Sequence, residues 1–71
     1  KNKGDEGKIA QALARLRAEG YRNCFVFVLR ENRSARRFYA AHGFAWDGTH
    51  EDIPFPPDTI CVDLRYTRSL P

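Results

Sequence analysis

The fold is decided by residues 24–44, which read CFVFVLRENRSARRFYAAHGF. The stretch opens with six consecutive apolar residues, a composition typical of a strand that is covered on both faces in a parallel sheet. We therefore predict a buried strand over residues 23–29. After it, Asn32 or Ser34 can cap a helix over residues 34–42, and Gly43 can end that helix.

An amphipathic helix is predicted before this strand, over residues 8–19. Its apolar residues recur at helical spacing, and a glycine stands where a C′ residue would end the helix. The residues concerned are Ile9, Ala12, Leu13, Leu16 and Gly20. A helix followed by a buried strand indicates an α/β architecture.

The C-terminal part predicts an antiparallel hairpin. Residues 44–49 are expected to form a short strand, and residues 59–67 alternate apolar and polar side chains, as a half-buried strand does. Between them, residues 51–58 read EDIPFPPD. Three prolines should prevent regular ladder pairing there, so this segment is predicted to be a functional loop.

The predicted order is helix, strand, helix, strand, strand, in a mixed sheet. A parallel strand needs a parallel neighbour, and a helix at the N-terminus normally crosses over from a preceding strand. The sequence contains no such strand before residue 8. We therefore expect residues 1–71 to be a single partial domain, or one whose missing strand comes from another chain.

Composition narrows the class of protein. Of the 71 residues 42% are hydrophobic and 30% are charged, and no apolar run approaches the roughly 18 residues that span a bilayer. The N-terminus lacks the apolar segment of a secretory signal, and Cys24 and Cys61 lack the spacing of a metal site or a disulfide scaffold. His42 and His50 do not complete a metal cluster either. We expect a soluble cytoplasmic protein without membrane or metal partners.

The net charge of +3 conceals an asymmetry between the two halves of the chain. Residues 1–37 hold ten basic and four acidic side chains (+6), whereas residues 38–71 hold two basic and five acidic ones (−3). A basic first half suits a polyphosphate ligand, although nucleic acid is attracted by the same field. Binding of nucleic acid through Arg30, Arg33, Arg36 and Arg37 is disfavoured, because no exposed aromatic face is interleaved with them.

The segment VLRENRSARRFYAAHGF, residues 28–44, resembles the strand, Asn, helix and "FY…GF" segment of the GNAT superfamily of acyl-CoA N-acyltransferases. The resemblance fixes an Asn after a buried strand, a Phe-Tyr pair and a Gly-Phe at consistent spacing, and it extends over nearly the whole chain. It implies the C-terminal half of a GNAT-like domain. The implied activity is transfer of an acetyl group from acetyl-CoA to a primary amine by direct attack.

In this reading Tyr39 matches the family's general acid. When an amine attacks a thioester the departing CoA sulfur becomes a thiolate, and a nearby hydroxyl lowers the barrier by protonating it. The alternative is that Tyr39 only packs, with its hydroxyl at the edge of the fold, as tyrosines on amphipathic helices commonly do.

The resemblance also implies cofactor-binding residues. Asn32 could bond the cofactor, cap the helix or do both. Phe38 and Arg37 are assigned beside it, Arg37 because it lies away from the core stripe. The family's Gly-rich pyrophosphate loop corresponds here to KGDEGK, residues 3–8, in which Gly4, Gly7 and Lys8 could form an anion nest, although Glu6 replaces the expected small residue. Acyl-CoA is then expected between the N-terminal ends of the two helices.

Two further expectations concern partners. The carboxylates Glu51, Asp52 and Asp58 favour a cationic amine acceptor near their loop. The alternative to an enzyme is a non-catalytic acetyltransferase-like module that forms a homodimer through the exposed edge of residues 23–29, because an unpaired apolar strand invites pairing with a second copy.

Overall fold

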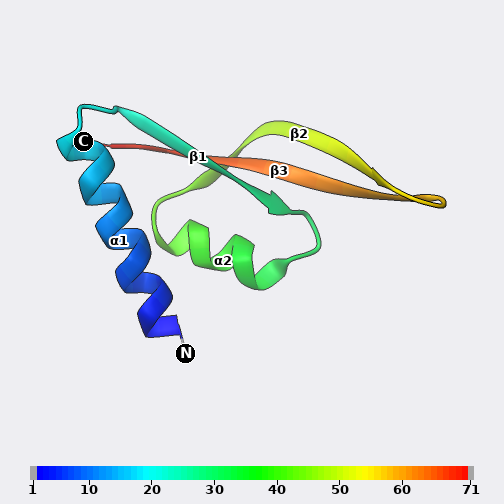
Figure 1. Cartoon of the computed structure of the whole chain (residues 1–71), viewed down its shortest axis with the longest axis horizontal. Coiled ribbons are helices and arrows are strands. Elements are labelled where there is room, and N and C mark those ends of the chain that lie inside the picture. The colour runs from blue at the N-terminus through cyan, green and yellow to red at the C-terminus, as the bar shows by residue number, and fades with distance from the viewer. Residues whose placement is uncertain (1, 71) are drawn as a thin grey trace.

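The computed structural model describes residues 2–70, with side chains from residue 7 onward. The elements are α1 (Asn2–Ala18), β1 (Asn23–Leu29), α2 (Arg33–Ala41), β2 (Ala45–Phe55) and β3 (Thr59–Ser69). The predicted α/β class and the order helix, strand, helix, strand, strand are confirmed. Both helices lie on one face of the sheet, and the β2–β3 hairpin extends beyond them (Figure 1).

The sheet has the strand order β1-β3-β2, and each pair of neighbours is antiparallel. The β2–β3 hairpin is therefore confirmed, whereas the mixed sheet is wrong for the described residues. The apolar run of β1 suggested a parallel strand with both faces covered. Instead β3 lies beside it in the opposite direction, and only one face of β1, with Val28 as its buried residue, packs against the helices.

The core lies between the sheet and the two helices. Val28, Phe44, Leu64 and Tyr66 form its buried centre. Partly buried apolar side chains of both helices and of β1 and β3 pack around it, namely Ile9, Leu13, Cys24, Val26, Ala35, Tyr39 and Val62. In the described part of the chain, no helix has both the length and the apolar character needed to cross a membrane.

Both helices end in the way that their glycines predict. Gly20 has φ +95° and Gly43 has φ +87°, values in the left-handed region that favours glycine. After α2, Gly43 N–H donates to Ala40 O at 3.1 Å and Phe44 N–H donates to Tyr39 O at 2.9 Å. This pair of bonds is a Schellman motif, and it places Phe44 in the core directly after the helix.

The start of α1 differs from the prediction. The helix begins at Asn2 and not at residue 8, so Gly4 and Gly7 lie inside a helix. Glycine in a helix interior costs roughly 1 kcal/mol relative to alanine, which weakens a helix without forbidding it. The expected glycine loop, and with it a loop-based anion nest, is therefore wrong.

The expected loop over residues 51–58 is also wrong for most of its length. β2 continues to Phe55, with Pro54 opposite Ile60 of β3. Arg30 N–H donates to Val62 O, so the even-numbered residues of β3 direct their backbone groups toward β1. Ile60 therefore forms no ladder bond with Pro54, whose nitrogen points to the open side of β2. A proline is tolerated at such an edge position.

Candidate functional site

A groove of about 730 Å³ lies between α1, β1 and α2. Most of its wall is apolar, and a few of its lining residues are polar. Its lining consists of Lys8, Ile9, Ala12, Leu13, Leu16, Cys24, Phe25, Val26, Asn32, Ser34, Ala35, Phe38, Tyr39 and Phe44. An apolar hollow with a small set of polar groups is the usual form of a small-molecule site.

The α2 end of the groove is positioned by a helix cap. Ala35 N–H donates to Asn32 Oδ1 at 3.1 Å, so the predicted capping role of Asn32 is confirmed. The cap uses the side-chain oxygen, so the amide NH₂ group takes no part in this bond, and Asn32 lines the groove. Ser34, the other candidate cap, also lines the groove.

Aromatic contacts hold the ring of Tyr39. It lies edge-on to Phe38, with ring centroids 5.2 Å apart, and edge-on to Phe44 at 5.4 Å. Phe44 is buried, so this contact ties the ring to the core. The tyrosine hydroxyl has no hydrogen-bond partner among the described residues. Tyr39 thus packs against the core, and the same residue lines the groove.

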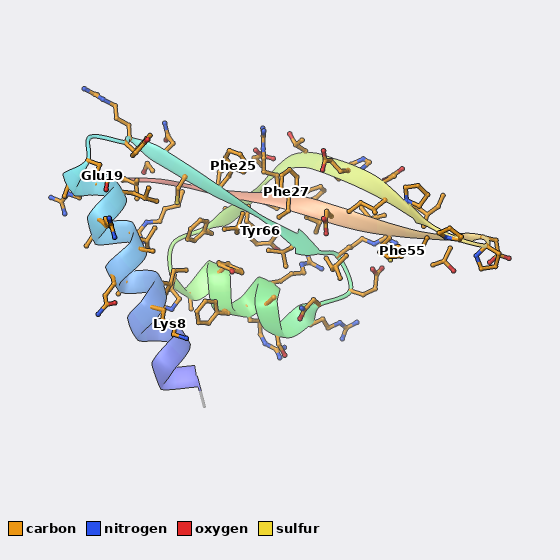
Figure 2. All side chains as sticks on the ribbon, in the orientation of Figure 1. Lys8, Glu19, Phe25, Phe27, Phe55 and Tyr66 are labelled. Carbon is orange, nitrogen blue, oxygen red and sulfur yellow. The ribbon has the colours of Figure 1, made fainter. Side chains whose placement is uncertain are left out.

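Charge in the described lining of the groove is one-sided. Among the lining residues whose side chains are described (residues 7–70), Lys8, exposed on α1 (Figure 2), is the one formally charged residue, and none is acidic. The N-terminal end of α2, which carries the positive end of the helix dipole, opens on the same groove through Asn32 and Ser34. The described polar groups of the groove therefore favour an anionic group.

Cys24 also lines the groove, but it is not activated. Burial raises the pKa of the Cys24 thiol, and the opposing effect of the Arg68 guanidinium is smaller. A thiol with a raised pKa is protonated at neutral pH and is a poor nucleophile.

Several predicted site residues are not brought together with the others. Arg37 does not line the groove; it lies on another surface of α2 with Arg33, Arg36 and Ala40. Gly7 is an exposed helical residue outside the lining. Gly4 has a helical backbone, and its surroundings lie outside the residues whose side chains are described. Lys8, Asn32, Phe38 and Tyr39 do meet at the groove.

The carboxylates expected near an amine acceptor lie elsewhere. The residues Glu51 and Asp52 are on β2, and Asp58 is in the turn of the hairpin, whose tip lies at the opposite end of the molecule from α1 (Figure 1). None of the three lines the groove. Among the described residues, no group of three or more His, Cys, Asp and Glu is placed to hold a metal ion.

Sequence reasoning missed the apolar wall of the groove. Ile9, Leu13 and Leu16 have the spacing of a core-facing stripe, and the sequence alone assigns them to the core. In the structure the same stripe is only partly buried and lines the groove. No match to this chain was found among protein-family models, curated proteins or solved structures.

Proposed function

We propose that this chain forms part of an N-acetyltransferase that uses acetyl-CoA and a primary amine, with Tyr39 as the general acid. The observation that carries the proposal is the groove, whose lining includes Tyr39, Asn32 and Lys8, with no hydrogen-bond partner for the Tyr39 hydroxyl among the described residues. The resemblance of residues 28–44 to the GNAT superfamily supplies the reaction class.

The groove suits the parts of an acyl-CoA. Its apolar wall offers contact to an aliphatic pantetheine arm, while Lys8, the Asn32 amide and the N-terminal end of α2 offer donors to phosphate or amide oxygens. The expected cofactor position between the two helices is compatible with this lining. Arg37, the remaining assigned residue, would have to act from outside the groove.

In the proposed reaction the amine nitrogen forms a bond to the thioester carbonyl carbon, and the carbon–sulfur bond breaks. Tyr39 gives its hydroxyl proton to the departing sulfur, so that CoA leaves as a thiol. The attacking nitrogen loses one proton to solvent, from which the tyrosine oxygen is reprotonated. Positioned proton donors of this kind contribute about 10²–10⁴-fold in rate.

The test compares Tyr39→Phe with the wild-type chain in acetyl-CoA binding and in amine-dependent release of CoA thiol. Removing only the hydroxyl keeps the ring packing, so we expect kcat to fall by about 10²–10⁴-fold with little change in the KM for acetyl-CoA. Melting temperature should change little. Tyr21→Phe is the matched control, because Tyr21 is exposed and lies outside the groove.

Binding is followed by chemical-shift changes on adding acetyl-CoA. We expect them at Ile9, Leu13, Asn32 and Tyr39, which line the groove. Changes confined to residues 61–65 would contradict the site. Normal turnover by Tyr39→Phe would contradict the acid role, and binding without any transfer to a panel of primary amines would contradict the enzymatic part of the proposal.

A further inference from the structure

The backbone of β1 has an open edge. Arg30 N–H donates to Val62 O at 2.8 Å and Leu70 N–H donates to Arg22 O at 2.6 Å, so the even-numbered residues from 22 to 30 direct their backbone groups toward β3. The odd-numbered residues Asn23, Phe25, Phe27 and Leu29 therefore direct theirs away from β3. Within residues 2–70, β1 has no second strand as a neighbour.

The same odd-numbered residues carry exposed apolar side chains. Phe25 is 58% exposed, Phe27 is 41% exposed and Leu29 is 43% exposed. Figure 2 shows Phe25 and Phe27 on the side of the sheet opposite the helices. Unpaired backbone groups and uncovered apolar side chains thus coincide in one short strand, which is the combination that natural proteins normally avoid at a free edge.

The other edge of the sheet is protected in the usual ways. On β2, Pro54 has no N–H to offer, and His50 and Asp52 are exposed polar residues joined at 3.1 Å. A shift in register between Trp46 and His50 further interrupts the strand. β1 contains neither proline nor charge nor bulge. The β1 edge therefore lacks the features that prevent a free edge from pairing with another strand.

We propose that a second copy of this chain pairs with β1 in antiparallel fashion, about a two-fold axis at Phe27. This pairing joins the two sheets into one. Only the odd-numbered residues of β1 have free backbone groups on this edge. The odd-numbered residues of one copy must therefore pair with odd-numbered residues of the other copy. Phe27 then lies opposite Phe27 of the second copy, and Phe25 lies opposite Leu29 of the second copy.

The side chains single out this register. The second copy can shift along β1 only by two residues at a time if odd-numbered residues are to stay opposite one another. Such a shift in one direction places Arg22 opposite Arg30 of the second copy, and like charges directly opposite are destabilising. A shift in the other direction places Phe25 opposite Glu31 of the second copy. In the proposed register Phe25 opposes Leu29, Val26 opposes Val28 and Phe27 opposes itself, while towards the ends Cys24 opposes Arg30 and Asn23 opposes Glu31. The edge is therefore complementary to itself, as a two-fold interface requires.

The first experiment measures the mass of the 71-residue chain in solution by sedimentation equilibrium. We expect a reversible dimer of the 8.2 kDa chain. Phe27→Lys places two like charges at the axis and removes an aromatic pair, so it should weaken dimerisation by about tenfold or more. Phe55→Lys is the matched control, since Phe55 is 51% exposed and lies on β2.

The second experiment tests the juxtaposition itself. Phe27→Lys and Phe27→Glu should each self-associate weakly. When the two variants are mixed they should form a mixed dimer, because opposite charges then meet at the two-fold axis. Circular dichroism of each variant verifies folding. A wild-type chain that stays monomeric, a dimer insensitive to Phe27→Lys, or charge variants that fail to associate when mixed would each overturn the proposal. Since mass is measured without substrate, these outcomes are independent of the acetyltransferase proposal.

Discussion

Asn32 shows how one side chain can serve both the fold and the site. Its Oδ1 accepts the Ala35 N–H at 3.1 Å and so fixes the first turn of α2. Its NH₂ group has no part in that bond, and Asn32 lines the groove. The cap uses Oδ1, and the proposed cofactor contact would use the NH₂ group, so substitution can separate the two roles.

Replacing Asn32 with Asp or with Ala should have different effects. Asn32→Asp keeps an acceptor for the cap and removes the amide donors, so stability should hold while acetyl-CoA affinity falls. Asn32→Ala removes both, and loss of the cap should also cost about 1 kcal/mol of unfolding free energy. Denaturation and titration calorimetry measure the two effects. Equal affinity of Asn32→Asp and wild type for acetyl-CoA would mean that the residue only caps.

Asp47 is the residue that links the bulged part of β2 to β3. Thr49 N–H donates to its Oδ1 at 2.8 Å, and Arg65 Nε donates to Oδ2 at 2.6 Å. Hydrogen bonding by the Thr49 backbone N–H, followed by that of Arg65, lowers the pKa of the Asp47 carboxyl. The folded state therefore favours the charged form.

This pKa shift gives a sign for the dependence of stability on pH. Because the folded-state pKa lies below the unfolded value of about 4, the contribution of Asp47 is present above about pH 4 and is lost as the pH falls through the folded-state pKa. We expect Asp47→Asn to be less stable at neutral pH. Its free energy of unfolding, measured with urea, should also fall less steeply than that of the wild type as the pH is lowered. Asp58→Asn in the hairpin turn serves as control; an unchanged pH dependence in Asp47→Asn would contradict the assignment.

At the scale of elements, the ends of the helices are the best predicted part of the fold. Gly20 and Gly43 both adopt positive φ, and Asn32 caps α2. These residue types act through local backbone chemistry, so their effect can be read from sequence. Pro54 is the opposite case. Whether a proline breaks a ladder depends on which way its nitrogen faces, and this is fixed by a partner strand that local sequence does not specify.

The two glycines provide a matched pair for measuring a close approach. A Cβ at Gly43 would meet Arg68 Nε at 3.2 Å, whereas a Cβ at Gly20 would meet nothing within 4 Å. Both positions have a left-handed conformation, which costs about 1–2 kcal/mol for a residue with a Cβ. Gly20→Ala should lose that amount, and Gly43→Ala should lose more, because Arg68 also donates to His42 O at 2.9 Å.

Thermal or urea unfolding of the two variants measures this difference. The additional loss in Gly43→Ala should disappear in an Arg68→Ala background, where the close contact no longer exists. An equal loss in both glycine variants would show that Arg68 moves aside without cost.

At the scale of the whole molecule, the sequence predicts the class and order of elements but not their layout. Both helices pack on one face of the sheet, and β3 is inserted between β1 and β2. The apolar run of β1 suggested coverage on both faces, because hydrophobicity alone does not show how many neighbours a strand has. The groove was also unpredictable in its full lining, since it arises where α1, β1 and α2 meet.

The unequal edges of the sheet have a consequence for how far self-association can proceed. A chain with two bare edges could add copies without limit and grow into a fibre. Here Pro54 and the interrupted register make the β2 edge unsuitable for pairing, while β1 has no second neighbour among residues 2–70. When two copies are joined through β1, the combined sheet has β2 at both of its edges. No further copy could then add to the sheet, and association would stop at the dimer. The proline that the sequence assigns to a loop would then act as a stop against polymerisation.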